Sequence, residues 1–157
     1  MYQIQVKRAL VDFLFPIREG WQVTVNLDGM ELGKGNQNSE AKYEIADKCK
    51  KWFESEGIVL GPHPKYRFAD IVASKGTSET HIIEVEGESS KQSEQALYSA
   101  LGQIIIQMDQ NIDILKYGLA VPDDPKWEKH LKKIPIYIRG RLDLQLYLVS
   151  ETGVRLL

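Results

Sequence analysis

The sequence predicts a single α/β domain in which helices pack on the faces of a mixed β-sheet. Segments with apolar residues at helical spacing alternate along the chain with short segments rich in isoleucine and valine. The 157 residues, 43% of them hydrophobic and 27% charged, are enough to bury one core. No repeat or low-complexity segment interrupts this order. We therefore expect one domain over residues 1–157, with an N-terminal extension at 1–38 and a core at 39–157.

The extension is predicted to contain a helix and a hairpin. Apolar side chains recur at helical spacing as far as Pro16, which limits the helix, although residues 2–6 also alternate like a strand. Both interpretations stay open there. The helical set is Val6, Leu10, Phe13, Leu14 and Ile17. Residues 21–27 alternate cleanly, and Asp28-Gly29 follows them as a strong hairpin signal.

The core segments follow in the order helix, two strands, helix, strand, helix and strand. Helices are predicted at residues 40–56, 91–108 and 124–133, with the second capped by Ser89 and Gln92. Strands are predicted at residues 67–74, 80–86, 117–121, 145–150 and 154–157. The first two of these strands are separated by residues 75–79 and should pair as a hairpin.

Composition excludes several classes of protein. Cys49 is the only cysteine, which excludes an internal disulfide and a multi-cysteine zinc site and indicates a core residue. The net charge of −2 argues against indiscriminate coating of nucleic acid but leaves room for a local basic patch. No apolar run is long enough for a membrane span, and the N-terminus lacks the features of a signal peptide. We therefore expect a soluble, cytoplasmic protein with no membrane partner.

Two carboxylates are predicted to face each other across the 67–86 hairpin. If its loop is centred on Thr77, cross-strand partners have numbers that sum to 154, which places Asp70 opposite Glu84. Like charges at that spacing destabilise a sheet unless something compensates them, and a divalent cation is the simplest compensation. Glu86 lies on the same face of its strand as Glu84, so three acids could converge on Mg²⁺ or Mn²⁺.

The inference depends on the hairpin register. With a loop one residue shorter, Asp70 would pair with Ile83 and the two acids would point to opposite faces. In the alternative interpretation, these acids lie on the solvated outer face of an amphipathic hairpin.

Three short stretches resemble the PD-(D/E)XK nuclease superfamily. They are FADIV at 68–72, IIEVE at 82–86 and ALYSALGQ at 96–103. The resemblance covers about residues 40–121 in element order, and it implies a restriction-endonuclease-like mixed sheet flanked by helices in αβββαβ order. It also implies that Asp70 and Glu84 bind the metal and that Gln103 supports the site.

The chain departs from the family pattern at the motif lysine. Glu86 occupies that position, and Ala69 stands where the motif has proline. Some members of the superfamily use glutamate there, and others carry the lysine on the next helix, where Lys91 is well placed. A third alternative is a site that binds but no longer cuts.

A basic segment near the C-terminus is the predicted contact for phosphates. Its residues are Lys126, Lys129, Lys133, Arg139 and Arg141. In the alternative interpretation, these residues form the exposed face of a short helix, since basic residues in a last turn also interact favourably with the helix dipole.

The sequence thus predicts a Mg²⁺- or Mn²⁺-dependent, endonuclease-like phosphodiesterase that acts on nucleic acid, with DNA preferred to RNA. The first alternative is a catalytically degenerate nuclease-fold protein that binds nucleic acid or a protein partner. A homodimer that uses the apolar N-terminal segment as its interface is a third, weaker option.

Overall fold

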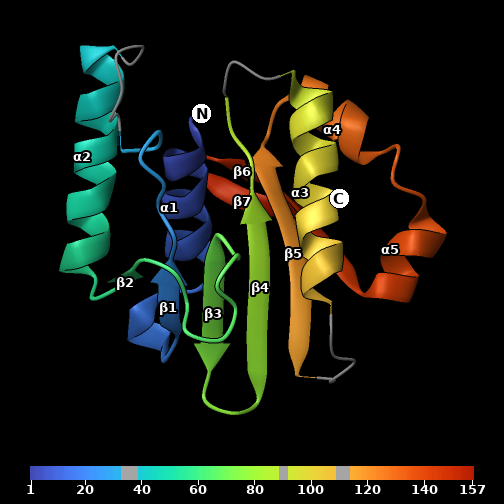
Figure 1. Ribbon diagram of the computed structural model, residues 1–157, viewed down its shortest axis with the longest axis horizontal. Helices are drawn as coiled ribbons and strands as arrows, with labels where there is room; N and C mark the ends of the chain where they lie inside the picture. The colour runs from blue at the N-terminus through green and yellow to red at the C-terminus, as the bar shows by residue number, and fades with distance from the viewer. Residues whose placement is uncertain (33–38, 89–91, 109–113) are drawn as a thin grey trace.

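The computed structural model describes residues 1–32, 39–88, 92–108 and 114–157 and has the predicted α/β architecture (Figure 1). A seven-stranded mixed sheet has the strand order β2-β1-β3-β4-β5-β6-β7. Its strands are β1 (Gln22–Val25), β2 (Val59–Leu60), β3 (Ile71–Lys75), β4 (Glu79–Val85), β5 (Leu115–Pro122), β6 (Leu144–Ser150) and β7 (Gly153–Leu156). The helices are α1 (Gln3–Leu14), α2 (Glu40–Ser55), α3 (Ser93–Gln107), α4 (Pro125–Leu131) and α5 (Ile136–Leu142), with a short 3-10 helix, η1, at Ile17–Glu19.

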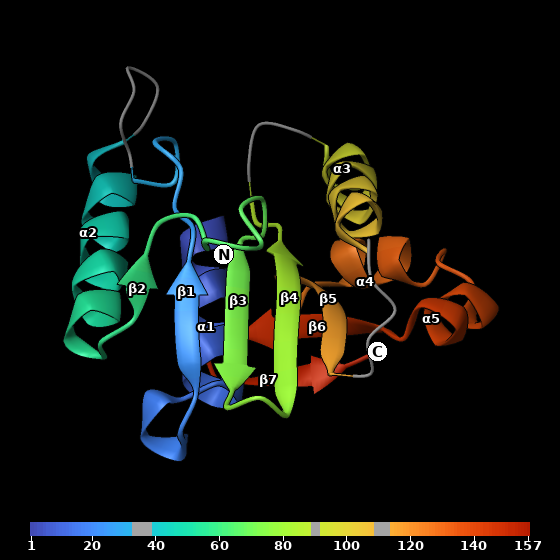
Figure 2. The same ribbon diagram turned by 60° about the horizontal axis from the view of Figure 1, so that its bottom comes forward.

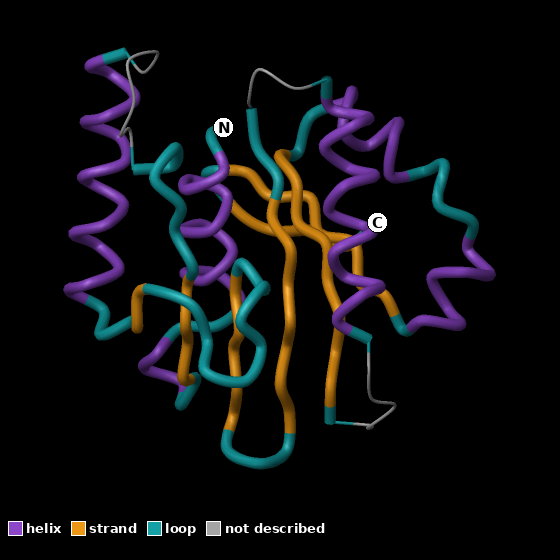
Figure 3. The backbone as a smooth tube through the Cα atoms, viewed as in Figure 1, coloured by secondary structure: helices purple, strands orange, loops and turns teal. Residues whose placement is uncertain are grey.

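The centre of the sheet has the predicted hairpin and crossover. β3 and β4 pair antiparallel, whereas β4, β5 and β6 run parallel to one another. Parallel neighbours need a long connection, and α3 supplies it between β4 and β5. The segments α4 and α5 connect β5 to β6. The tube in Figure 3 shows this alternation of helix and strand along the chain.

Two apolar clusters cover the two faces of the sheet. Ile71, Ile83 and their odd-numbered neighbours pack with α1 and α2. Val72 and Ile82, which point the other way because side chains alternate along a strand, pack with α3 and α4. Figure 2 shows α1 and α3 on opposite sides of the sheet. The predicted core position of Cys49 is confirmed, since this residue is 3% exposed and belongs to the cluster that packs with α1 and α2.

The first 38 residues are integral to the domain where the structure describes them. α1 confirms the helical interpretation of residues 2–14, and β1 pairs with β3 inside the sheet. The apolar face of α1, including Ile4 and Leu10, is buried in the core. These residues therefore contribute to the core of the domain, and the homodimer that the sequence suggested stays a prediction. None of the described helices is long and apolar enough to cross a membrane.

Two local predictions are wrong. The hairpin at Asp28 does not form, because the Asp28 side chain accepts the backbone N–H of Glu31 at 2.7 Å and closes a turn, while β1 pairs with β2 and β3 instead. Helix α5 was also missed. It begins directly after Pro135 and buries none of its residues, so its sequence lacks an amphipathic pattern.

Candidate functional site

The Asp70–Glu84 pair forms as the hairpin register predicts. The β3–β4 ladder runs from Ile71 opposite Ile83 to Lys75 opposite Glu79, so partner numbers sum to 154. Asp70 directly precedes β3, where its carbonyl accepts the Asn26 N–H at 2.8 Å. Its Oδ2 accepts the backbone N–H of Val85 at 2.9 Å. These bonds fix the aspartate across from the end of β4.

Glu84 is the buried member of the pair. Its side chain is 1% exposed, and its Oε1 accepts a hydrogen bond from Gln107 Nε2 at 2.6 Å. The pKa of Glu84 is raised to about 9, first by burial and then by the Asp70 charge and a hydrogen bond between the two carboxyl groups, while the hydrogen bond from Gln107 opposes the shift. Glu84 is therefore protonated near neutral pH and donates to Asp70 when no cation is bound.

Lys7 of α1 supplies a positive charge that the sequence analysis missed. Its ammonium group is 2.7 Å from Asp70 Oδ1, 2.8 Å from Glu31 Oε2 and 2.7 Å from the Asn26 carbonyl. The side chain is 0% exposed. Burial lowers the pKa of Lys7, but the Asp70 and Glu31 carboxylates outweigh that cost and leave the pKa above its usual value. Lys7 therefore stays charged and holds the Asp70 carboxyl group in place.

The sequence carried a signal for Lys7. Ile4, Lys7 and Val11 are spaced three and four apart, so the lysine lies within the apolar stripe of the helix rather than on its solvated face. A lysine at such a position is almost never fully buried unless it is paired. Its acidic partners, however, are 24 and 63 residues away in the sequence, and only the fold brings them together.

Glu31 and Gln3 complete the surroundings of Asp70. Glu31 Oε2 also accepts the Asp28 N–H at 3.0 Å, while its buried Oε1 has no hydrogen-bond partner among the described residues. Burial raises the pKa of Glu31, and the Lys7 charge opposes that shift. Gln3 Nε2 donates to Asp70 Oδ2 at 3.3 Å and to the Val85 carbonyl at 2.7 Å.

The acid cluster has fewer members than predicted. Among the described residues, no group of three or more His, Cys, Asp and Glu side chains could hold a metal ion. Glu86 follows the last residue of β4, donates its N–H to the Ala120 carbonyl at 2.9 Å and is partly exposed, whereas Glu84 is buried. Its convergence with Asp70 and Glu84 as a third ligand is therefore not found.

Two carboxylates still fit a hydrated divalent cation. Mg²⁺ usually keeps several waters and takes only one or two protein carboxylates. Gln107 Oε1 is a buried oxygen beside Glu84 with no hydrogen-bond partner in the described part of the chain, which adds an acceptor for a metal-bound water. Asp70 and Glu84 would be the direct ligands, with Gln107 in the next layer.

The glutamine beside Glu84 is not the one that the family pattern indicated. Gln103 is exposed, and its backbone carbonyl accepts from Gln107 Nε2 at 3.2 Å. The Tyr117 hydroxyl donates to the Gln107 carbonyl at 3.4 Å, and Tyr117 lies beside Ile82 of β4. The last turn of α3, rather than its middle, therefore lies against the pair. Lys91 lies outside the described residues.

The predicted basic segment is divided between two helices. Lys126 and Lys129 lie on α4, with Lys126 5.8 Å from the Trp127 ring and Lys129 exposed. Lys133, after α4, pairs with Glu94 at 2.5 Å. On α5, Arg139 donates to the Leu157 carbonyl at 3.2 Å, and Arg141 lies 5.9 Å from the Tyr137 ring. Lys133 and Arg139 thus already have partners within the protein.

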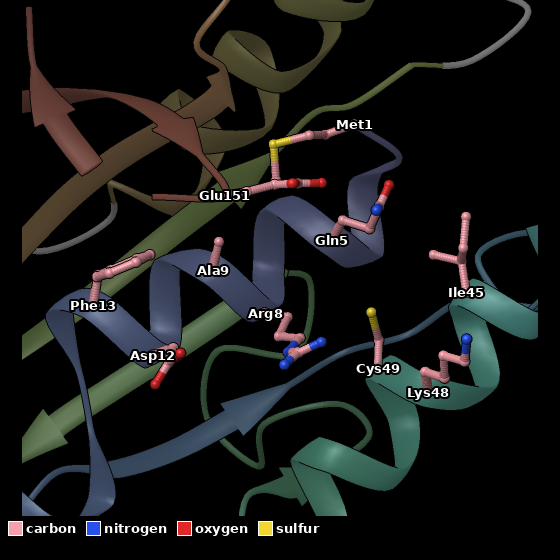
Figure 4. A pocket seen from close by; sticks show the side chains of 10 residues that line it. All are labelled: Met1, Gln5, Arg8, Ala9, Asp12, Phe13, Ile45, Lys48, Cys49 and Glu151. Atoms are coloured by element: carbon pink, nitrogen blue, oxygen red, sulfur yellow. The ribbon is translucent and has the colours of Figure 1, made fainter. Parts of the chain in front are cut away.

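A pocket of about 340 Å³ lies on the other side of the molecule, between α1 and α2 (Figure 4). Arg8, Asp12 and Cys49 are among its lining residues, and the Arg8 guanidinium lies 5.2 Å from the Trp52 ring. Neither Asp70 nor Glu84 lines it. This concave feature beside α1 is therefore separate from the carboxylate pair.

The candidate site thus combines a carboxyl pair on the central hairpin with a buried lysine from the first helix and a glutamine from α3. This arrangement provides two carboxyl groups as oxygen ligands in a largely buried setting. No protein-family model, curated protein or solved structure matches the chain at a significant level.

Proposed function

We propose that this protein is a metal-dependent nuclease that hydrolyses phosphodiester bonds, preferably in DNA, on a restriction-endonuclease-like core. The observation that carries the proposal is the contact between the Asp70 and Glu84 carboxyl groups, stabilised on one side by Lys7 and on the other by Gln107. Opposed carboxyls cost stability, so the residues that fix them in place argue for a role that needs them together.

Each residue of the site has a distinct role in this proposal. Asp70 is oriented by Lys7 and by the Val85 N–H and would bind Mg²⁺ or Mn²⁺. Glu84 loses its proton when it becomes the second ligand, because metal ligands must be deprotonated. A cation held there by Asp70 and Glu84 would supply polarisation of a phosphoryl oxygen and a lower pKa for a bound water. Glu86 is partly exposed at the motif position, and we assign it the role of accepting the proton of the attacking water.

Lys7 acts as a positioning residue. An ammonium group has three protons, and those of Lys7 are accounted for by Asn26, Glu31 and Asp70. No proton remains to bind a phosphate or a water. Lys7 therefore does not replace the motif lysine in its direct role, and it acts on the reaction through Asp70.

The same observation favours a second candidate, a catalytically degenerate nuclease-fold protein that binds nucleic acid. Lys7 already neutralises charge at Asp70, as a cation would, and the motif lysine is replaced by Glu86. In this case the pair would be structural, and affinity for nucleic acid would not need a metal.

The test is cleavage of labelled single- and double-stranded DNA and RNA with Mg²⁺, Mn²⁺ or EDTA. A nuclease cuts at least one substrate with metal and none with EDTA, and Asp70→Asn or Glu84→Gln abolishes cutting. Asp47→Asn is the matched control, because Asp47 is a surface acid on α2 that pairs only with Lys51 among the described residues. Binding without cleavage under every condition would overturn the nuclease proposal in favour of the binding protein.

A further inference from the structure

The loop between β2 and β3, residues 61–70, combines exposed cations with an exposed aromatic ring directly before Asp70. It contains Lys65 and Arg67 but no acidic residue before Asp70. Both cations are exposed, and neither has an acidic partner in the part of the chain that the structure describes. Phe68 is 79% exposed, two residues from the proposed metal ligand. We refer to Lys65, Arg67 and Phe68 as the loop surface.

Hydrogen bonds and packing of neighbouring residues hold the loop surface in place. His63 Nδ1 accepts the backbone N–H groups of Lys65 and Tyr66 at 3.2 and 3.1 Å, and its ring stacks on Tyr66 at 5.3 Å. Tyr66 packs against the cluster on the α3 face, and the buried Ala69 donates its N–H to the Tyr66 carbonyl. Phe68 is therefore presented to solvent by a loop whose neighbouring residues are anchored.

The loop lies on the same side of the sheet as Glu84. Figures 1 and 2 show it crossing in front of β3 on the side that carries α3. Beside it is a pocket of about 310 Å³, whose lining includes His63, Thr24 and Ser74. Val72 also lines this pocket and, like Tyr66 of the loop, belongs to the cluster on the α3 face, so the pocket and the loop adjoin that face.

We propose that the loop surface binds an unpaired stretch of nucleic acid next to Asp70, with one base stacked on Phe68 and phosphates paired with Lys65 and Arg67. The inference rests on the proposed function and adds a substrate class: single strands, or duplexes with unpaired ends. Bases inside a duplex are already stacked on each other, so an exposed ring gains a partner only from an unpaired base. Basic residues interleaved with aromatic ones provide the two contacts that single strands need.

The experiment measures binding in EDTA, where no cleavage occurs, by fluorescence anisotropy with labelled oligo(dT), oligo(U) and a blunt DNA duplex. We expect both single strands to bind more tightly than the duplex. Phe68→Ala should weaken single-strand binding by about tenfold or more, the effect of removing one stacked base, and Phe68→Trp should restore it. Tyr43→Ala is the control, because Tyr43 is an exposed aromatic residue on α2. It should bind as the wild type does.

The contribution of Lys65 and Arg67 to binding is measured separately, through its salt dependence. Replacing Lys65 and Arg67 with alanine should reduce the slope of log K against log salt by about 0.7 for each phosphate of a single strand that the protein no longer neutralises. Arg18→Ala, an exposed cation on η1, should leave the slope unchanged. The ratio of affinities for oligo(dT) and oligo(U) measures the preference between these two strands.

The outcomes separate this inference from the nuclease proposal. Single-strand binding that depends on Phe68, in a protein that cuts nothing, supports the loop surface and overturns the nuclease. Metal-dependent cleavage with affinity unchanged by Phe68→Ala overturns the loop surface and leaves the nuclease standing. Equal or tighter binding of the blunt duplex also overturns the inference. So does the absence of binding to any probe at low salt, which would assign the loop surface to a protein partner.

Discussion

Replacement of Lys7 by methionine should destabilise the protein more than any other single loss of charge at the site. The change keeps an unbranched side chain of similar length but removes the ammonium group and its three hydrogen bonds. Two carboxylates, Asp70 and Glu31, are then left without their cation in a buried environment. Breaking a buried ion pair by removing one partner costs about 3–5 kcal/mol, because the remaining charge is uncompensated.

The surroundings favour the lower end of that range. Asp70 is 17% exposed and keeps its hydrogen bonds from Val85 and Gln3, so water and amides compensate part of its charge. Glu31 is 6% exposed, and its pKa is already raised by burial, so it can take up a proton. We expect a loss of about 3 kcal/mol. For a domain of this size that corresponds to a fall in Tm of about 6–12 °C.

Circular dichroism during thermal and urea unfolding in EDTA measures the loss of stability. Lys50→Met, a half-exposed helix lysine, should leave the Tm nearly unchanged. In the Lys7→Met/Glu31→Gln double variant the destabilisation should be smaller than the sum of the two single effects, because one of the stranded charges is gone. A destabilisation below about 1 kcal/mol for Lys7→Met would refute the reasoning, since a pair that weak behaves like one at the surface.

Three further outcomes concern pH, metal and salt. Because the pKa of Glu84 is raised to about 9, the folded state keeps a proton that the unfolded state has released. The free energy of unfolding in EDTA should therefore fall as the pH rises toward 9. Denaturation midpoints of Glu84→Gln should not show this fall. Mg²⁺ or Mn²⁺ should raise the Tm of the wild type but not of Asp70→Asn, and an unchanged wild-type Tm at millimolar metal would count against the site. The double variant Lys129→Ala/Lys133→Ala should flatten the salt dependence of nucleic-acid binding. Most of the effect should come from Lys129, because Lys133 already pairs with Glu94. An unchanged slope would mean that α4 is an ordinary charged surface.

The sequence predicted the central hairpin, and it predicted the register on the condition that the loop is centred on Thr77. Strand alternation and the length of the loop around Thr77 are local features, and together they place Asp70 opposite Glu84. The order of α2, β3, β4, α3 and β5 followed from periodicity for the same reason, whereas the short β2 was not predicted. Asp28-Gly29 was misread because its hairpin signal is also a turn signal, and the choice between them depended on β3, which takes the place beside β1.

The rest of the site depended on distances that local patterns do not encode. Lys7 approaches Asp70 only because α1 packs across the sheet, and no sequence spacing relates the two. Gln103 and Gln107 belong to one polar stripe on α3, and the choice between them depends on which turn of the helix packs against Glu84. The stripe could be predicted from the sequence, but the turn that contacts Glu84 could not.

Glu86 distinguishes an active site from a degenerate one. If it is the general base, Glu86→Gln should lower the cleavage rate by roughly 10²–10⁴-fold while the metal-induced rise in Tm persists, because Asp70 and Glu84 still bind the cation. Lys7→Met, measured at a temperature where it is folded, should lower the rate through metal affinity, and raising the metal concentration should recover part of it. A wild type that cuts nothing, together with a Glu86→Lys variant that cuts with Mg²⁺, would show that restoring the motif ammonium restores activity. The native protein would then be a binding protein, and the buried Lys7–Asp70 pair would serve its stability alone.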